Sequence, residues 1–233
     1  MNIEPPFVRA TLLKRYKRFL ADIRFEDGTE TTAHCANPGS MMGLAEPGST
    51  VWLSKSDNPK RKLAWSWELV EVGGARVGIN TARPNALVAE AIGGGHVPEL
   101  AGYETLRREV KYGQNSRIDL LLESPDRPSA YVEIKSVTLS RAPGLAEFPD
   151  AKTARGAKHM AELAEMAKNG HRAVVFFLVQ RTDCNGFAPA ADIDPAYAES
   201  LAAAISAGVE VLCYSCRIEP DLIEIDRVLE TAM

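Results

Sequence analysis

Three charged side chains inside two apolar segments constrain the fold of this chain more than any other feature. Asp119 lies within SRIDLLLE, residues 116–123, and Glu133 and Lys135 lie within AYVEIKSVTL, residues 130–139. Segments of this length that are rich in Val, Ile and Leu are typical of buried strands. Because an unpaired charge in a core costs on the order of several kcal/mol, these three residues need partners or a function.

Strand geometry predicts that the three charges share one patch of sheet. Alternation of side chains places Glu133 and Lys135 on the same face, and a hairpin connection would bring Asp119 beside them. Two carboxylates so close repel each other unless a cation joins them. Mg²⁺ or Mn²⁺ is the expected ion, because such ions bind a few carboxylates and phosphate oxygens while they keep several waters.

An aspartate followed on the next strand by Glu-x-Lys, ahead of a helix with basic residues, is the site of the PD-(D/E)xK nucleases. We therefore predict Asp119, Glu133 and Lys135 as catalytic residues, with Lys135 orienting or deprotonating a water and offsetting charge on the phosphate. Asp119 and Glu133 would bind the metal together with Glu90, which precedes the strands on a short helix. Two alternatives stay open: a structural ion triad, and a Glu90 that is simply exposed to solvent.

Residues 8 to about 80 contain strand-like segments punctuated by Gly and Pro. Five such segments, the first unusually long, favour a small β-barrel of the oligonucleotide-binding (OB) type, and we place this domain at residues 1–82. The segments are VRATLLKRYKRFLADIRF, TETTAHC, STVWLS, WSWELVEV and ARVGIN.

Residues 83–233 mix helical and strand patterns, which predicts a mixed α/β sheet covered by helices. A short helix, NALVAEAI with Asn85 as a possible cap, precedes three strands at hairpin-like separations. A longer helix follows, with Asp150 as a possible cap and Asn169-Gly170 at its end. RAVVFFLVQ is then an almost wholly apolar central strand, and a further helix and strand follow it. The predicted fold class is therefore mixed α+β: an OB-like barrel, then a restriction-endonuclease-like α/β domain of the PD-(D/E)xK type.

The total net charge argues against nucleic-acid binding, but the distribution of charge along the chain favours it. The whole chain carries −4, but residues 183–233 hold ten acidic residues against two arginines, so residues 1–182 carry +4. Phosphate binding depends on local basic surfaces rather than on the total charge. An ordinary solvated surface is the alternative for each basic cluster. The predicted nucleic-acid-binding residues are Arg9, Lys14, Arg15, Lys17, Arg18, Lys60, Arg61, Lys62, Arg155 and Lys158.

Seven segments together resemble one known family, the sugar fermentation stimulation protein A family, in the same order from about Arg9 to Gln180. The resemblance implies an OB-like domain joined to a PD-(D/E)xK-like domain, non-specific DNA binding and a regulatory role in sugar metabolism. Ala36 and Pro38 depart from the family pattern, so no role is assigned to Asn37 or Ser40. The segments are KRYKRFLADI, HCANPGSMMG, SDNPKRK, SRIDLLLE, YVEIKSVTL, FPDAKTARGAKHMAEL and RAVVFFLVQ.

The residues and the resemblance lead to one expected function and two alternatives. We expect a non-sequence-specific DNA-binding protein with a Mg²⁺-competent site that hydrolyses phosphodiesters. The alternatives are a DNA-binding regulator that keeps the triad without turnover, and a phosphodiesterase for RNA or a small nucleotide. No signal peptide or membrane span of roughly 18 apolar residues is visible, and four scattered cysteines suit a reducing cytoplasm, so we expect a cytoplasmic protein.

Overall fold

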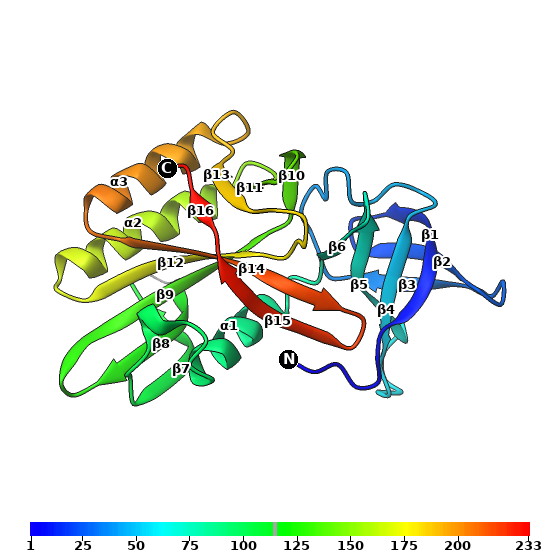
Figure 1. Cartoon of the computed structure of the whole chain (residues 1–233), viewed down its shortest axis with the longest axis horizontal. Coiled ribbons are helices and arrows are strands. Elements are labelled where there is room, and N and C mark those ends of the chain that lie inside the picture. Colours follow the sequence, from blue (N-terminus) through cyan, green and yellow to red (C-terminus); the bar gives the residue numbers. More distant parts are fainter. Residues whose placement is uncertain (114–115) are drawn as a thin grey trace.

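The computed structural model of the chain describes residues 1–113 and 116–233, an all-β part followed by a sheet with helices (Figure 1). In the first part, pairing of β3 with β5 closes the sheet into a barrel, and β6 pairs with the outer edge of β5. The predicted five-stranded barrel is therefore confirmed. Its strands are β1 (Val8–Tyr16), β2 (Leu20–Phe25), β3 (Glu30–Cys35), β4 (Thr50–Lys55), β5 (Trp65–Val72) and the added β6 (Ala75–Gly78).

The prediction of one long first strand over residues 8–25 is wrong, because the chain reverses in its middle. Tyr16 pairs with Leu20 across a tight turn, and β1 and β2 run antiparallel from there. Lys17 and Arg18 adopt left-handed φ angles of 47° and 63° to make this turn. Hairpin turns of this kind usually contain Asn or Gly, and these residues allow the turn to be predicted from a sequence. Two basic residues at the same positions give no such signal.

The second part is built on a six-stranded mixed sheet in the order β15-β14-β12-β9-β8-β7. Strands β9, β12 and β14 run parallel to one another, while β7, β8 and β9 form an antiparallel meander. The arrangement agrees with the predicted sequence of strands and helices and adds one strand, β15, at one edge. The bounds are β7 (Thr105–Tyr112), β8 (Ser116–Ser124), β9 (Arg127–Val137), β12 (Arg172–Val179), β14 (Glu210–Glu219) and β15 (Leu222–Val228).

Helices cover both faces of this sheet. Helix α1 (Pro84–Gly93) and the short 3-10 turn Pro98–Leu100 pack on one face with the core that contains Leu120 and Val132. Helices α2 (Ala154–Lys168) and α3 (Pro195–Ser206) pack on the opposite face with Val175 and Phe177. Any side chain of β8 or β9 therefore faces either α1 or the α2–α3 layer.

Both predicted N-terminal helix caps are wrong. Helix α1 starts with Pro84 at its first position, so Asn85 lies inside the first turn and its side chain is free for other contacts. Helix α2 is capped by Thr153, whose side chain accepts a hydrogen bond from the backbone N–H of Gly156. The C-terminal end of α2 at Asn169 agrees with the sequence prediction.

A second, small sheet lies between the large sheet and the barrel, and the sequence analysis did not predict it. Its strands are two to four residues long, too short to show a hydrophobic period. This sheet carries the chain from β9 to α2 and so sets the course of residues 148–153 beside the barrel. The strands are β10 (Leu139–Ala142), β11 (Leu145–Phe148), β13 (Gly186–Pro189) and β16 (Glu230–Thr231).

The two parts of the chain contact each other at several places. The N-terminal segment runs along β15, where Ile3 and Phe7 donate backbone hydrogen bonds to residues 220–221 and bury their side chains in the α1-side core. Gly78 at the end of β6 donates to the backbone oxygen of Gln180. In the described part of the chain, helices long and apolar enough to cross a membrane are absent.

Candidate active site

The candidate site forms where strands β8 and β9 separate. Their backbone pairing runs as far as Leu120 and Val132, and Asp119 and Glu133 are the next residues on each strand. Beyond that point, the Asp119 carboxylate enters the ladder: its Oδ2 accepts a hydrogen bond of 2.7 Å from the backbone N–H of Ile134. The opening of the sheet therefore places two carboxylates on neighbouring strands at one point.

Glu133 is buried, with 3% of its surface exposed, and it uses its two oxygens differently. Its Oε1 accepts a hydrogen bond of 2.9 Å from Nζ of Lys135 and a second from Nδ1 of His159. Its Oε2 is buried and has no hydrogen-bond partner among the described residues. Burial alone would raise the pKa of Glu133, but the hydrogen bond from His159 and the charge of Lys135 outweigh it and hold the pKa below its usual value. The carboxylate is therefore ionised at neutral pH.

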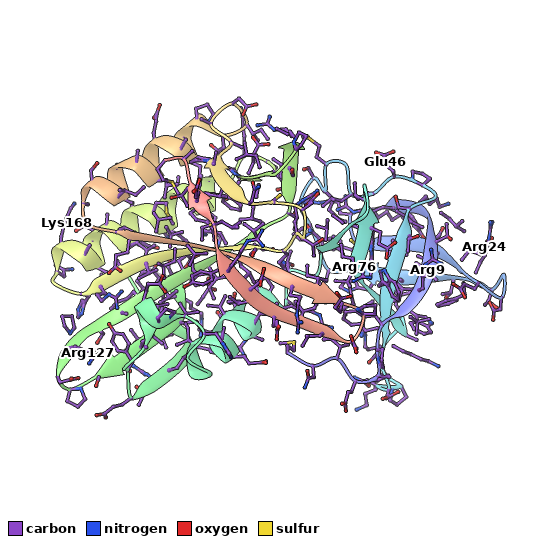
Figure 2. The ribbon with its side chains drawn as sticks, viewed as in Figure 1. Arg9, Arg24, Glu46, Arg76, Arg127 and Lys168 are labelled. Carbon is purple, nitrogen blue, oxygen red and sulfur yellow. The ribbon has the colours of Figure 1, made fainter. Side chains whose placement is uncertain are left out.

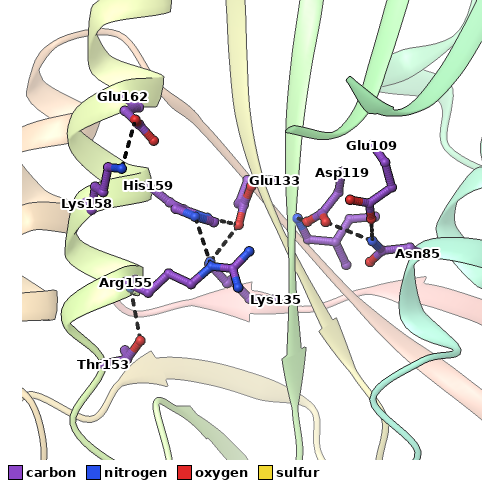
Figure 3. Close-up of polar contacts among 12 residues, drawn as sticks. Asn85, Glu109, Asp119, Glu133, Lys135, Thr153, Arg155, Lys158, His159 and Glu162 are labelled. Atoms are coloured by element: carbon purple, nitrogen blue, oxygen red, sulfur yellow. Dashed lines mark hydrogen bonds and ion pairs between the residues drawn. The ribbon is translucent and has the colours of Figure 1, made fainter. Parts of the chain in front are cut away.

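Asp119 turns towards α1 rather than towards α2. Its Oδ1 accepts a hydrogen bond of 2.8 Å from the side-chain amide of Asn85 in the first turn of α1. Burial, and then the nearby charge of Glu133, raise the pKa of Asp119 to about 6. The two carboxylates therefore repel each other, although their hydrogen-bond partners lie on opposite faces of the sheet, as Figure 3 shows.

His159 connects Glu133 to the basic face of α2. Arg155, one helical turn earlier, donates from Nε to Nε2 of His159 at 3.3 Å. With Nε2 acting as acceptor, the imidazole carries its proton on Nδ1 and donates it to Glu133. His159 is 4% exposed, so the ring is fixed by packing as well as by these bonds. This contact of His159 was not predicted from the sequence.

Glu109 is a further acidic residue that the sequence analysis missed. It lies on β7 across from Asp119, and the side-chain amide of Asn85 donates to its Oε1 at 3.2 Å. Its φ angle is 54°, a left-handed value that costs a residue other than glycine about 1–3 kcal/mol. Strained backbone of this kind is found preferentially at functional sites.

Glu90, predicted as a third metal ligand, is not brought to the carboxylates. It pairs instead with the amino group of Met1 at 2.7 Å, and its side chain is 56% exposed. Five residues separate it from Asn85 on α1, which turns it about 140° away from the helix face that meets Asp119. Within residues 1–113 and 116–233, groups of three or more His, Cys, Asp or Glu side chains arranged to hold a metal are absent.

The α2 side of the site contains further buried polar atoms without hydrogen bonds. Within residues 1–113 and 116–233, neither carboxylate oxygen of Glu162 has a hydrogen-bond partner, and the ammonium of Lys158 lies 3.7 Å away. The hydroxyl of Tyr112 is also buried, and it has no hydrogen-bond partner in the part of the chain that the structure describes. Burial, with the charges of Glu133, Glu162 and Asp119, raises the pKa of Tyr112 above its usual value. The buried oxygens of Glu162 and Tyr112 near Glu133 could therefore still form hydrogen bonds.

The predicted basic residues occupy several places rather than one patch. Arg9 pairs with Glu26 near the start of β1, while Lys17 lies beyond the end of the strand, about 25 Å away for an extended chain. Lys14 pairs with Asp22, and Arg15 and Arg18 donate to backbone oxygens of residues 37–40. The other predicted basic residues lie in the β4–β5 connection, namely Lys60, Arg61 and Lys62, and on α2, namely Arg155 and Lys158. In Figure 2, Arg9 lies on the barrel.

The fold and the site together define a class of protein. A closed barrel of five strands precedes a mixed sheet covered by helices, and two neighbouring strands of that sheet carry an aspartate and a Glu-x-Lys motif. The N-terminal part is an OB domain, and the C-terminal part is the sheet-and-helix domain that accompanies it.

Comparison with known proteins identifies the family within this class. The family model for the "Sugar fermentation stimulation protein RE domain" matches residues 82–222, and the model for the "SfsA N-terminal OB domain" matches residues 13–79. The chain belongs to the sugar fermentation stimulation protein family, so the resemblance seen in the sequence is confirmed.

Relatives cover nearly the full length of the chain. A sugar fermentation stimulation protein homolog of Paramagnetospirillum magneticum is 62% identical over 97% of this chain and 95% of its own length. The homolog of Rhodospirillum centenum is 61% identical over 98% of both chains. Among solved structures, Pyrococcus furiosus SfsA in complex with Ca²⁺ is 27% identical, with a TM-score of 0.91 over 100% of this chain and 98% of that one.

Proposed function

We propose that this chain is a non-sequence-specific DNA-binding protein whose C-terminal domain hydrolyses phosphodiester bonds with the help of Mg²⁺ or Mn²⁺. The observation that carries the proposal is the buried Oε2 of Glu133, an ionised oxygen that has no hydrogen-bond partner among the described residues and lies next to Asp119 and Lys135. Buried polar atoms are nearly always hydrogen-bonded, so an unpartnered carboxylate oxygen points to a ligand.

The residues present fit a divalent cation. Asp119 and Glu133 offer hard oxygen ligands on adjacent strands, and the raised pKa of Asp119 reflects in part the repulsion that a cation would relieve. Two carboxylates suit Mg²⁺ in particular, because this ion keeps several waters and takes further oxygens from a phosphate. The solved relative from Pyrococcus furiosus is a Ca²⁺ complex, which supports the use of a divalent ion in this family.

The side chains around the ion have separate tasks in this proposal. A divalent metal supplies Lewis-acid polarisation of the phosphate and lowers the pKa of a water. Lys135 places its positive charge where negative charge develops on the phosphoryl oxygens. His159 holds Glu133 through Oε1, and Asn85 holds Asp119 through Oδ1, so both carboxylates are oriented before substrate arrives. Arg155 and Lys158 on α2 would contact flanking phosphates.

DNA binding without sequence preference follows from the distribution of positive charge. The predicted basic residues lie on strand β1, in connections between strands and on helix α2, and they do not form a helix face suited to reading base edges. The N-terminal OB domain is a fold that commonly binds nucleic acid strands. We retain Lys14, Lys17, Lys60 and Lys62 as proposed phosphate contacts, because their side chains are exposed to solvent.

A non-catalytic regulator is the second candidate, and one observation favours it. Lys135 and His159 both bind Oε1 of Glu133, which makes a closed group of buried charges that could serve stability alone. In that case Asp119, Glu133 and Lys135 would be retained for structure, and the protein would bind DNA without cleaving it.

Substitution of Lys135 separates the two candidates. In a catalytic site, Lys135→Ala should keep DNA affinity and metal binding but lose on the order of a hundredfold or more in cleavage rate, because the lysine acts mainly in the transition state. If the triad serves stability alone, the same change should destabilise the fold by about 3–5 kcal/mol, because the buried charge of Glu133 would lose the positive charge of Lys135 beside it.

The assay combines cleavage of labelled single-stranded and duplex DNA in Mg²⁺ or Mn²⁺ with urea unfolding of both proteins. An active wild type beside a stable, inactive variant supports the nuclease. An inactive wild type beside a strongly destabilised variant excludes it and leaves the regulator.

A further inference from the structure

The turn between β1 and β2 presents an unusual combination of residues. Lys17 and Arg18 occupy left-handed backbone conformations that hairpin turns usually give to Asn or Gly. Phe19 follows them and is 46% exposed, one of the largest apolar side chains left open to solvent. A strained backbone that displays two cations and an aromatic ring is a feature that stability does not explain. We call these three residues the hairpin tip.

A groove of about 720 Å³ lies between the hairpin side of the barrel and the C-terminal domain. The barrel contributes Arg15 and Arg18, and the chain segment before α2 contributes Phe148, Asp150 and Lys152. The lining contains one carboxylate, Asp150, which hydrogen bonds hold in place. Its Oδ2 accepts a hydrogen bond from the hydroxyl of Ser40 at 3.1 Å and another from the backbone N–H of Met41 at 3.2 Å. The groove therefore has a fixed carboxylate and three cations.

The three cations outnumber the one carboxylate of the groove, and among the described residues none of the three is ion-paired. Arg15 donates to the backbone oxygens of Asn37 and Gly39, and Arg18 donates to that of Pro38 at 2.8 Å. Lys152 is exposed, and within the described residues it has no hydrogen bond or ion pair. Cations that face one groove without an anionic partner create a positive potential suited to phosphate.

The groove lies at the N-terminal end of α2, the helix that carries His159 of the candidate active site. Its lining ends at Thr153, the N-cap of α2, and Arg155 and His159 follow within the first two turns of that helix. At 1.5 Å per residue, His159 lies about 9 Å along the helix from Thr153. A strand held by Arg18 and Lys152 would thus continue towards Arg155 and Glu133.

We propose that the hairpin tip and this groove bind one single DNA strand on its way to the carboxylates. The phosphates would contact Arg18 and Lys152, and a base would stack on Phe19. Stacking on an exposed ring requires a base that is not already stacked in a duplex, which is why the occupant is a single strand. This inference rests on the proposed function and adds to it the strand form and the path.

The test measures binding without turnover. Fluorescence anisotropy in EDTA compares a labelled oligothymidylate with a blunt duplex of the same length. We expect wild type to bind the single strand more tightly, and we expect Phe19→Ala and the double variant Arg18→Ala/Lys152→Ala each to weaken this binding on the order of tenfold. Arg24→Ala/Lys168→Ala is the matched control, because it removes two positive charges at opposite ends of the molecule (Figure 2).

The outcomes separate this inference from the proposed function. Wild type that binds neither probe overturns the DNA-binding function itself. Wild type that binds DNA, but with groove variants equal to the control or with no preference for the single strand, overturns only the path. Lys152→Ala alone guards against misfolding, because this substitution breaks no hydrogen bond or ion pair among the described residues: it should weaken binding while its melting curve matches wild type.

Discussion

At the scale of single residues, Glu133 is the centre of the site because its two oxygens have different surroundings. Oε1 is held by Lys135 and His159, whereas Oε2 has no hydrogen-bond partner in the described part of the chain. A ligand carboxylate that is fixed through one oxygen and open through the other is pre-oriented for a metal. The fixing bond from His159 is therefore as much a part of the site as the carboxylate.

The role of His159 predicts a difference between two substitutions. His159→Ala should lower the free energy of unfolding by about 1–3 kcal/mol, because Glu133 loses a buried hydrogen-bond donor. His159→Asn should recover most of this stability, since its side-chain amide can donate from nearly the position of Nδ1. Urea unfolding of the two variants checks this, and equal destabilisation would show that the ring serves only to fill space.

Single-residue contacts of this kind were the least predictable from the sequence. The spacing of Asp119, Glu133 and Lys135 along two apolar segments was enough to predict their type of chemistry. Asn85 and His159 reach the carboxylates only because α1 and α2 cover opposite faces of the sheet, and nothing local in either helix encodes that. Glu90 was misplaced for the same reason: its helix was predicted, but not the direction in which each side of that helix faces.

At the scale of elements, long apolar strands were predictable and short or turning ones were not. RAVVFFLVQ became the central strand β12 because an almost unbroken run of buried positions leaves few alternatives. The four short strands of the small sheet carry too few residues for a pattern, and they are held by tertiary pairing instead. The β1–β2 turn escaped notice because Lys17 and Arg18 are not residues that usually mark a turn.

The N-terminal segment offers a prediction at this scale. Phe7 is 4% exposed and belongs to the core beneath α1, although it precedes the first barrel strand. Phe7→Ala should therefore destabilise the C-terminal domain by about 3–5 kcal/mol, because it removes buried apolar surface and leaves a cavity. Val8→Ala is the control, because Val8 is 42% exposed and should change stability by no more than about 0.5 kcal/mol. Thermal or urea unfolding checks both, and a Phe7→Ala protein as stable as the control would mean that the segment is not part of that core.

At the scale of the whole molecule, hydrogen bonds join the barrel to the C-terminal domain. Asp150 ties the loop that follows β3 to the segment before α2, and Gly78 ties the barrel to the end of β12. The two family matches end and begin at residues 79 and 82, close to the division we predicted between residues 82 and 83. We propose that the two folding units divide between residues 82 and 83 and that residues 1–7 pack against the C-terminal unit.

Charge distributed over the whole molecule predicts how DNA affinity depends on salt. If exposed lysines bind phosphates, the logarithm of affinity should fall steeply with the logarithm of salt concentration. Lys14→Ala/Lys17→Ala should make this slope shallower by about 0.7–0.9 for each phosphate that the variant no longer binds. Arg15 is left in place because it holds the loop of residues 37–40. Titrations at several salt concentrations measure the slope, and an unchanged slope would remove these two lysines from the interface.

Thermal unfolding with and without Mn²⁺ tests the central claim, a divalent metal held by Asp119 and Glu133. A ligand that binds only the folded protein stabilises it by about 2.7 kcal/mol at a hundredfold excess over its Kd, so wild type should melt at a higher temperature with the ion. Glu90→Gln should respond like wild type, because Glu90 pairs with the amino group of Met1 and faces away. Asp119→Asn should show little or no shift. An Asp119→Asn protein that gains as much stability from Mn²⁺ as wild type does would contradict the metal site.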